Sequence, residues 1–311
     1  MKCPQEQPAI VIAGPTASGK SRLALALAER CAGVVINADS MQVYRELSIL
    51  TARPTAQEET RAPHALYGFV GAADGYSAGR YAVDAARAIA QARAGGRVPI
   101  VVGGTGLYFK ALLEGLSPVP AIEPDVRAHW RGQAVLLPAT ELYAILACRD
   151  PVTAARLLPT DPQRIVRALE VLDSTGRSLA EWQRTPGKPV LAERAALRLL
   201  VLPDRNTHAA IIDARFDAML AAGALEEVSR LVALGLSDEL PIMRALGVAP
   251  LAAAIAGKLA LSEAAARAKA ETRQFSKRQI TWYKRNMIAW NRLSTQESEN
   301  LEGVDLSFIG R

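Results

Sequence analysis

The sequence predicts an α/β fold in which helices flank a parallel β-sheet and a small all-helical domain is inserted. Short apolar runs of strand type alternate with longer segments in which alanine and leucine recur at helical spacing. The first apolar run leads through a glycine-rich turn into a helix, and a later stretch contains only short helical segments separated by prolines. Strands that are apolar throughout are typical of a parallel sheet covered on both faces.

Four short apolar segments are expected to form the strands, and they are Ala9–Ala13, Val34–Asn37, Pro99–Val102 and Leu197–Leu202. A helix is expected from Lys20 to Cys31. A second helix is expected to begin at the N-cap Ser77 and to stop at Gly95-Gly96. After Leu202 the chain is expected to be helical to about Arg292 and to end in a polar tail.

Residues 118–189 are expected to form the inserted domain, and residues 1–117 and 190–311 the core. The inserted stretch shows no strand pattern. Asp150-Pro151 and Asp161-Pro162 each supply an N-cap residue followed by a proline in the first helical turn. Because 311 residues with 50% hydrophobic content suffice for about two domains, both parts can bury a core.

Composition argues against several classes of protein. The three cysteines, Cys3, Cys31 and Cys148, lie far apart and only three histidines are present, so neither a disulfide scaffold nor a zinc site is expected. No apolar run approaches the ~18 residues of a membrane span, and the first residues lack the apolar core of a signal peptide. We expect a cytoplasmic protein with no membrane partner.

A phosphate-binding loop follows the first strand. Residues 14–21 read GPTASGKS and match the pattern GxxxxGK[ST] between a predicted strand and a predicted helix. In such a loop backbone N–H groups surround phosphate oxygens, Lys20 adds a positive charge, and the Ser21 hydroxyl can ligate Mg²⁺. The core is therefore predicted to be P-loop NTPase-like, with a nucleotide-binding, ATP-type loop; the alternative is a tight turn without a ligand.

One carboxylate is expected beside this loop. In P-loop ATPases an acidic residue commonly follows a later strand, but the third strand here runs into Gly103-Gly104-Thr105. The acid comes instead after the second strand, as Asp39, and the carboxyl ends of parallel strands meet at one edge of the sheet. Asp39 is therefore predicted to face an acceptor group; the alternative is that it only caps a turn.

Positive charge is concentrated towards the C-terminus. From Arg267 to Arg292 eight residues are basic and only Glu271 is acidic, in a chain of net charge +6. Four aromatic residues lie among them, namely Phe275, Trp282, Tyr283 and Trp290. Basic side chains neutralise phosphates and aromatic rings stack on bases, so the segment suits a nucleic acid. The alternative is a helix with a solvated basic face and its aromatic residues in the core.

Five motifs together resemble, in order and spacing, those of the bacterial tRNA dimethylallyltransferases (tRNA isopentenyltransferases). They are GPTASGKS from Gly14, NADSMQVY from Asn37, VGGTGLYFKALLEG from Val102, DPQRIVRALEV from Asp161 and RQFSKRQITWYK from Arg273. The resemblance covers about residues 8–292. It implies a magnesium-dependent transfer of a dimethylallyl group from dimethylallyl diphosphate to the N6 amine of adenosine 37 in tRNA, with release of pyrophosphate.

The resemblance also implies roles for individual residues. Asp39 is implied as the general base, with Thr105 and Arg215 as further catalytic contacts to pyrophosphate. The diphosphate-binding residues are Gly14, Pro15, Thr16, Ala17, Ser18, Gly19, Lys20 and Ser21, and Ser21 is the expected magnesium ligand. The implied tRNA contacts are Asp39, Ser40, Met41, Gln42, Thr105, Arg127, Gln163, Arg164, Ile165, Val166, Arg167, Arg244, Lys277, Arg278 and Lys284.

The inserted domain is implied to grip the tRNA anticodon stem-loop while the adenine is flipped out of its stack. On a helix, Gln163, Arg164 and Arg167 share a polar face, whereas Ile165 and Val166 turn away. An ion pair within that helix between Arg167 and Glu170 is the alternative to RNA contact. We expect the protein to act as a monomer.

The sequence departs from the family at three places. Arg53 stands in a Thr-Ala-Arg-Pro segment where many members have lysine, and residues 244–249 lack the aromatic residue and second cation of a frequent tRNA-contact segment. The stretch between Trp130 and Asp150 is short. Two other functions stay open, namely a P-loop kinase of a nucleoside or small metabolite and an RNA-binding protein with a vestigial loop.

Overall fold

The computed structural model of the protein describes residues 8–192, 195–301 and 304. The chain forms two compact units, one of residues 1–113 with 190–311 and one of residues 114–189. We call them the core unit and the helical unit. Cys3 and most of the expected polar tail lie outside the described residues.

The helical unit begins at Glu114 rather than at the expected Pro118. Close backbone contact between the entering and leaving chain explains the earlier start. A Cβ atom added to Gly115 would lie 2.5 Å from the carbonyl carbon of Gly187, so the two segments touch through their glycines.

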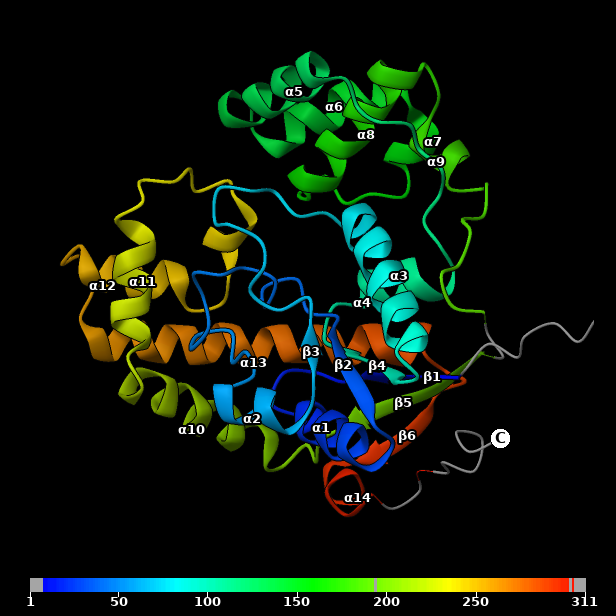
Figure 1. Ribbon diagram of the computed structural model, residues 1–311. Helices are drawn as coiled ribbons and strands as arrows, with labels where there is room; N and C mark the ends of the chain where they lie inside the picture. The colour runs from blue at the N-terminus through cyan, green and yellow to red at the C-terminus, as the bar shows by residue number, and fades with distance from the viewer. Residues whose placement is uncertain (1–7, 193–194, 302–303, 305–311) are drawn as a thin grey trace, which may run out of the picture. The chain divides into compact units, whose positions relative to one another are not determined.

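Six parallel strands form the sheet of the core unit, in the order β3-β2-β4-β1-β5-β6 (Figure 1). They are β1 (Ala9–Ala13), β2 (Gly33–Asn37), β3 (His64–Ala65), β4 (Val98–Gly103), β5 (Ala196–Leu202) and β6 (Asn291–Ser294). The central strand β1 lies between β4 and β5, with Ile12 opposite Val102 and Leu199. The predicted parallel α/β sheet is confirmed.

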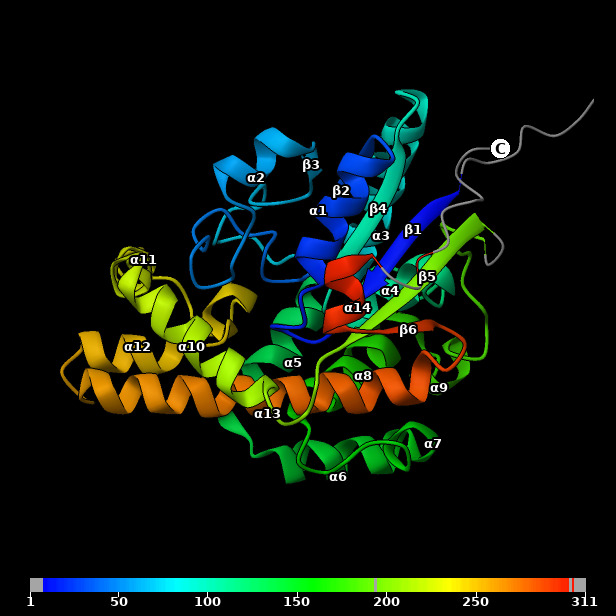
Figure 2. The same cartoon turned by 90° about the horizontal axis from the view of Figure 1, so that it is seen from below.

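Helices cover both faces of this sheet. They are α1 (Lys20–Arg30), α2 (Ala56–Arg61), α3 (Ala78–Ala94), α4 (Gly106–Leu113), α10 (His208–Ala221), α11 (Ala224–Val232), α12 (Val248–Ile255), α13 (Leu261–Asn286) and α14 (Thr295–Asn300), with a short 3₁₀ helix η2 (Pro241–Arg244). Ser77 caps α3 by accepting a hydrogen bond from the backbone N–H of Arg80. Figure 2 shows β4, β1 and β5 side by side, with the long helix α13 crossing this part of the unit.

The alternating residues of β1 enter two separate cores. Ile10 and Ile12 pack with α1, whereas Val11 packs with residues of α3, α4 and α13. All three side chains are fully buried. This arrangement explains why the strand is apolar at every position.

Two strands were not expected from the sequence, and one of them corrects the predicted C-terminal region. The chain is not helical from Leu202 to Arg292, because α13 ends at Asn286 and β6 then pairs with β5. Only Leu293 of β6 is buried, so this edge strand carries no apolar run that would identify it. The other unexpected strand, β3, has two residues.

The helical unit contains α5 (Pro124–Leu136), α6 (Ala139–Arg149), α7 (Pro151–Ala154), α8 (Pro162–Thr175) and α9 (Leu179–Trp182). Asp150 and Asp161 cap α7 and α8, each with a proline in the first turn. Trp130, Leu142 and Leu169 belong to a core of its own. No helix in the described part of the chain is both long enough and apolar enough to cross a bilayer.

Candidate active site

The loop between β1 and α1 has the geometry of an anion-binding site. A side chain at Gly14 would collide with the Ser18 Oγ at 2.6 Å, and Ala17 and Gly19 adopt positive φ angles of 59° and 86°. The backbone N–H groups of Ala17 and Gly19 have no hydrogen-bond partner among the described residues, and the Ser18 hydroxyl is buried and unpaired. Since buried donors are nearly always paired, this loop fits a negatively charged ligand.

Three charged side chains meet beside the loop. Burial lowers the pKa of Lys20 to about 8, the nearby Asp39 raises it, and the nearby Arg215 lowers it. Burial also lowers the pKa of Arg215, and Asp39 opposes that shift. Two cations and one carboxylate, from α1, α10 and the turn after β2, therefore share one electrostatic environment.

Asp39 is held in place by its own turn. The buried Asn37 accepts a hydrogen bond from the Asp39 N–H at 2.8 Å and donates its amide to the Asp39 carbonyl at 2.9 Å. The Asp39 Oδ1 accepts from the N–H of Met41 at 2.9 Å. Its Oδ2 has no hydrogen-bond partner among the described residues. One oxygen thus caps the turn, and the other is available to a ligand.

Three tyrosines feel the charge of this carboxylate. Burial raises the pKa values of Tyr67, Tyr108 and Tyr283 well above the ordinary tyrosine value, and the negative charge of Asp39 raises all three further. None of these phenols ionises at neutral pH.

Two residues of α13 fix the phosphate-binding loop, and sequence reasoning missed their role. The Gln279 Oε1 accepts from the Thr16 N–H at 3.0 Å, and its Nε2 donates to the Gly104 carbonyl at 2.8 Å. The Tyr283 hydroxyl lies 2.9 Å from that carbonyl and 3.2 Å from the carbonyl of Gly14. One helix face therefore ties the loop after β1 to the turn after β4, and the Thr16 N–H is already engaged.

His208 is a second residue whose role sequence reasoning missed. Its Nε2 lies 2.9 Å from the Thr16 carbonyl oxygen, and the side chain is buried. At the other end of the loop, Thr295 of α14 donates its hydroxyl to the Ser18 carbonyl at 3.1 Å. No local pattern in the sequence links these residues to a loop almost 200 and almost 280 positions away.

The predicted tRNA contacts near Asp39 are partly engaged within the protein. The Thr105 hydroxyl accepts from the Ser40 N–H at 2.9 Å and lies 3.3 Å from the Ser40 hydroxyl. The Gln42 side-chain amide donates to the carbonyls of Thr51 and Ala52, both at 2.9 Å. Thr105 therefore joins the turn after β4 to the turn after β2. The Gln42 side chain keeps only its Oε1 oxygen for a ligand.

In the helical unit, Ile165 and Val166 are wrong as side-chain contacts to RNA. Both are buried in the core of the unit. The backbone periodicity of α8 that turns Gln163 and Arg164 outward turns these two inward. Arg167 pairs with Glu170 at 3.5 Å, which is the alternative that the sequence left open.

The remaining predicted contacts lie on surfaces. Arg127 of α5 and Arg244 of η2 are exposed. In the divergent segment after Arg244, Ala245 and Val248 are buried. Arg53, the departure from the family's lysine, donates to the Tyr44 carbonyl at 3.1 Å and so holds its own loop.

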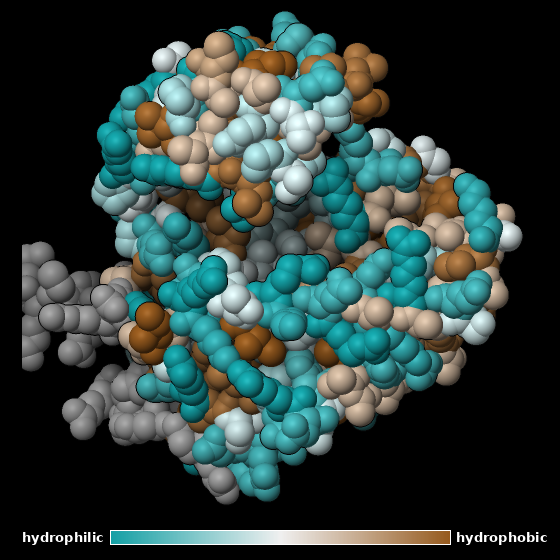
Figure 3. Space-filling model, turned by 180° about the vertical axis from the view of Figure 1, so that it is seen from behind, coloured by the Kyte–Doolittle hydropathy of each residue, from teal (hydrophilic) through white to brown (hydrophobic). Residues whose placement is uncertain are grey.

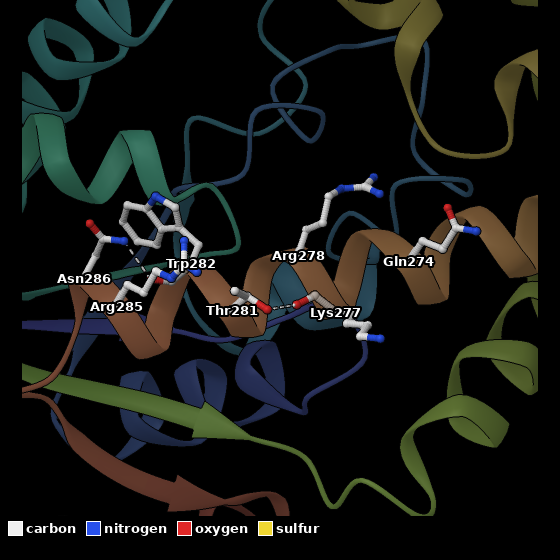
Figure 4. Close-up of a pocket in the computed structure, with 7 residues that line it drawn as sticks. All are labelled: Gln274, Lys277, Arg278, Thr281, Trp282, Arg285 and Asn286. Atoms are coloured by element: carbon white, nitrogen blue, oxygen red, sulfur yellow. Dashed lines mark hydrogen bonds between the residues drawn. The ribbon is translucent and has the colours of Figure 1, made fainter. Parts of the chain in front are cut away.

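The basic face of α13 forms a shallow depression of about 550 Å³. It is lined by Gln274, Lys277, Arg278, Thr281, Trp282, Arg285 and Asn286, all on one helix (Figure 4). The predicted tRNA contacts Lys277 and Arg278 both line this depression, whereas Lys284 is exposed but does not line it. Trp282 lines it, while Tyr283 and Trp290 are buried, as the alternative with aromatic residues in the core expects for these two.

One face of the molecule is largely hydrophilic. In the view from behind, hydrophilic side chains cover much of the surface and smaller hydrophobic groups lie between them (Figure 3). Many basic residues of α13 are exposed, including Lys277, Arg278 and Arg285. Such a surface suits a polyanion, and phosphate contacts of this kind bind without reading sequence.

The residues beside the loop can hold a divalent cation only in part. Ser21 is exposed, and its hydroxyl is the protein ligand expected from the loop pattern. No group of three or more His, Cys, Asp or Glu side chains suited to a metal occurs among the described residues. This donor set fits Mg²⁺, which is commonly bound through one or two protein oxygens together with substrate phosphates.

We predict that Gly104→Ala weakens binding of a diphosphate to the loop while the protein still folds. The added methyl group would lie 2.6 Å from the Gln279 Nε2 and 3.4 Å from the Asp39 Oδ2. Gln279 must then move and release the Thr16 N–H. Gly71→Ala is the control, because its methyl group would meet no atom within 4 Å. For both variants, calorimetry measures diphosphate affinity and circular dichroism measures the melting temperature. Unchanged diphosphate binding in Gly104→Ala would contradict the prediction.

Comparisons with known proteins relate the whole chain to one family. The family model described as IPP transferase matches residues 42–286, and the model described as isopentenyl transferase matches residues 8–65. A protein of Parvibaculum lavamentivorans named tRNA dimethylallyltransferase is 53% identical over 301 residues, covering 97% of this chain and 95% of that protein. A protein of the same name from Azorhizobium caulinodans is 51% identical, covering 91% of each chain.

Solved structures extend the likeness to the fold. A tRNA isopentenylpyrophosphate transferase of Staphylococcus epidermidis has a TM-score of 0.65 at 31% identity, with 93% of each chain covered. A eukaryotic dimethylallyltransferase acting on tRNA has a TM-score of 0.79 at 29% identity, covering 92% of this chain and 73% of that one. With a family model across most of the sequence and relatives half identical over nearly all of it, the chain belongs to the IPP transferase family.

Proposed function

We propose that the protein transfers a dimethylallyl group from dimethylallyl diphosphate to the N6 amine of adenosine 37 in tRNA. The observation that carries this proposal is a loop with unpaired N–H groups, beside which Lys20, Arg215 and Asp39 influence one another electrostatically. Cations and N–H groups suit a departing pyrophosphate, and a carboxylate suits an amine that loses a proton. The anticodon stem-loop is the proposed acceptor, and the enzyme acts as a cytoplasmic monomer.

The bond from the allylic carbon to the diphosphate oxygen breaks, and its electron pair leaves with pyrophosphate. Negative charge therefore grows on the diphosphate oxygens. The N–H groups of Ala17 and Gly19, together with Lys20 and Arg215, stabilise that charge in a largely buried setting, where fixed donors are most effective. Mg²⁺, held through the Ser21 hydroxyl, supplies further charge neutralisation when bound.

The adenine N6 forms the new bond to the allylic carbon and gives up one proton. The Asp39 Oδ2 accepts it, because this oxygen has no other partner among the described residues while Oδ1 keeps the turn in place. Asn37 fixes the backbone of Asp39 on both sides. A positioned general base contributes ~10²–10⁴ in rate.

The comparisons favour this function over a P-loop kinase, because the relatives reported above are named for transfer of an isopentenyl or dimethylallyl group. A vestigial loop is also disfavoured, since Lys20 lies in a shared electrostatic environment with Asp39 and Arg215.

One incubation distinguishes the three functions. The protein is mixed with labelled dimethylallyl diphosphate, Mg²⁺ and unmodified tRNA, and the tRNA is then digested. Labelled N6-dimethylallyl adenosine in the digested tRNA supports the proposal; transfer only from ATP, or no transfer, refutes it.

We predict that replacing Lys277 and Arg278 together with alanine weakens tRNA binding and lowers its salt slope by up to about 2. Both side chains line the depression on α13 and are exposed. The matched control removes Arg267 and Lys269 from the same helix, because these form ion pairs with Glu271 and Asp217. Fluorescence anisotropy over a salt series measures the slope. Equal slopes in both double variants would assign Lys277 and Arg278 to a merely solvated face.

A further inference from the structure

The loop of residues 38–55, which follows β2 and carries Asp39, has no helix or strand of its own. Its single sheet-like contact is the isolated bridge from Tyr44 to Val70. A loop this long without regular structure needs other contacts to keep one shape. Those contacts decide how the proposed acceptor residues Ser40, Met41 and Gln42 are presented.

One buried carboxylate supplies much of that support. The Glu227 Oε1 accepts from the Ser48 N–H at 2.7 Å, the Ser48 hydroxyl at 2.9 Å and the Ile49 N–H at 2.9 Å. Its Oε2 accepts from the Leu50 N–H at 2.9 Å. Glu227 is 2% exposed and belongs to α11, far along the chain from the loop.

No cation pairs with Glu227 among the described residues, so loop donors alone balance its charge. Hydrogen bonds to an ionised acceptor are stronger than neutral ones, and three successive N–H groups around one anion form a nest. Removing the carboxylate would leave these donors unsatisfied in a half-buried turn, which is costly. The turn at residues 48–50 therefore keeps its shape because of Glu227.

The turn at residues 48–50 leads directly into the residues that hold the Gln42 side chain. The carbonyls of Thr51 and Ala52, next along the loop, accept both side-chain N–H bonds of Gln42. The Glu227 carboxylate is thus linked through residues 48–52 to a side chain three positions after Asp39. The diphosphate loop is tied instead by Gln279, His208 and Thr295, none of which contacts residues 48–52 by a hydrogen bond in the described structure.

We infer that Glu227 is a positioning residue for the RNA acceptor. It fixes the conformation of the loop that presents the Gln42 side-chain oxygen to tRNA. It does not affect the phosphate-binding loop of residues 14–21. This inference rests on the proposed function. It separates two supports of one active site, with α11 holding the acceptor side and α13 holding the donor side.

The test is Glu227→Gln, which keeps the size of the side chain but turns an amide towards donors. We expect KM for tRNA to rise by about tenfold or more, while the affinity for dimethylallyl diphosphate stays within about twofold. Glu226→Gln is the matched control, because Glu226 precedes it on the same helix and is exposed. It is expected to match the wild type.

A double variant adds a measurement that general destabilisation would not produce. Because Glu227 acts through Gln42, the tRNA effects of Gln42→Ala and Glu227→Gln should be non-additive. Additive effects, an unchanged KM, or an equal loss of diphosphate and tRNA affinity would each overturn the inference. If Glu227→Gln does not fold, Ser48→Ala is tested in its place. A raised KM for tRNA at constant diphosphate affinity supports the inference, and an unchanged KM for tRNA overturns it. A wild-type protein that transfers no label refutes the proposed function separately.

Discussion

Replacing Asp39 with asparagine is expected to lower the rate of transfer by ~10²-fold or more while tRNA binding stays nearly unchanged. Asparagine keeps an oxygen that can accept the Met41 N–H, so the turn after β2 is preserved. It cannot take a proton at the position of Oδ2. The loss therefore falls on the chemical step and not on recognition.

Single-turnover transfer from labelled dimethylallyl diphosphate measures this rate, and fluorescence anisotropy measures tRNA affinity. Asp74→Asn is a suitable control, because Asp74 is an exposed partner of Arg80 elsewhere in the core unit. If Asp39→Asn lost affinity and rate to the same extent, Asp39 would be a recognition residue and the proposed base would be wrong.

Replacing Lys20 with methionine is expected to lower the affinity for dimethylallyl diphosphate by ~10- to 100-fold, the range of a lost hydrogen bond to a charged group. The substitution keeps an unbranched apolar side chain but removes the ammonium beside the unpaired loop donors. Titration calorimetry compares it with Lys258→Met, which removes an exposed lysine. Equal affinities in the two variants would remove Lys20 from the diphosphate site.

Lys20 also predicts a pH dependence. Burial lowers its pKa to about 8, so the unliganded enzyme loses this charge as the pH rises above that value. The allylic diphosphate is already ionised above pH 8. The affinity of the enzyme for it should therefore fall by up to about tenfold per pH unit in that range. Lys20→Met should lack this step, and a wild type equally independent of pH would contradict the assignment.

Folding stability changes with pH in the opposite direction. The unfolded chain retains the lysine proton up to the ordinary pKa of 10.5, whereas the folded protein releases it near 8. Between these values the unfolded state binds more protons, so the free energy of unfolding of the unliganded protein rises with pH. The increase relative to Lys20→Met is measured by denaturant titration across that window.

Local chemistry was sufficient to predict much of the fold. The apolar segment that became β1, the glycine pattern of residues 14–21 and the Ser77 cap of α3 each depend on neighbours only a few positions away. The four predicted strands occur in the structure, with ends that shift by at most one residue. Only the short edge strands β3 and β6 were missed, because β3 has two half-buried residues and β6 has four residues with one buried, which gives no periodic signal.

The sequence by itself determined the parallel sheet, the phosphate-binding loop and the side chains from which the proposed chemistry is built. The tertiary structure alone decided what supports them. Gln279 reaches the Thr16 N–H, and Glu227 reaches the turn at residues 48–50, through single side chains that bond to distant backbone groups. Such bonds follow no spacing rule, because they depend on how helices far along the chain pack against the sheet.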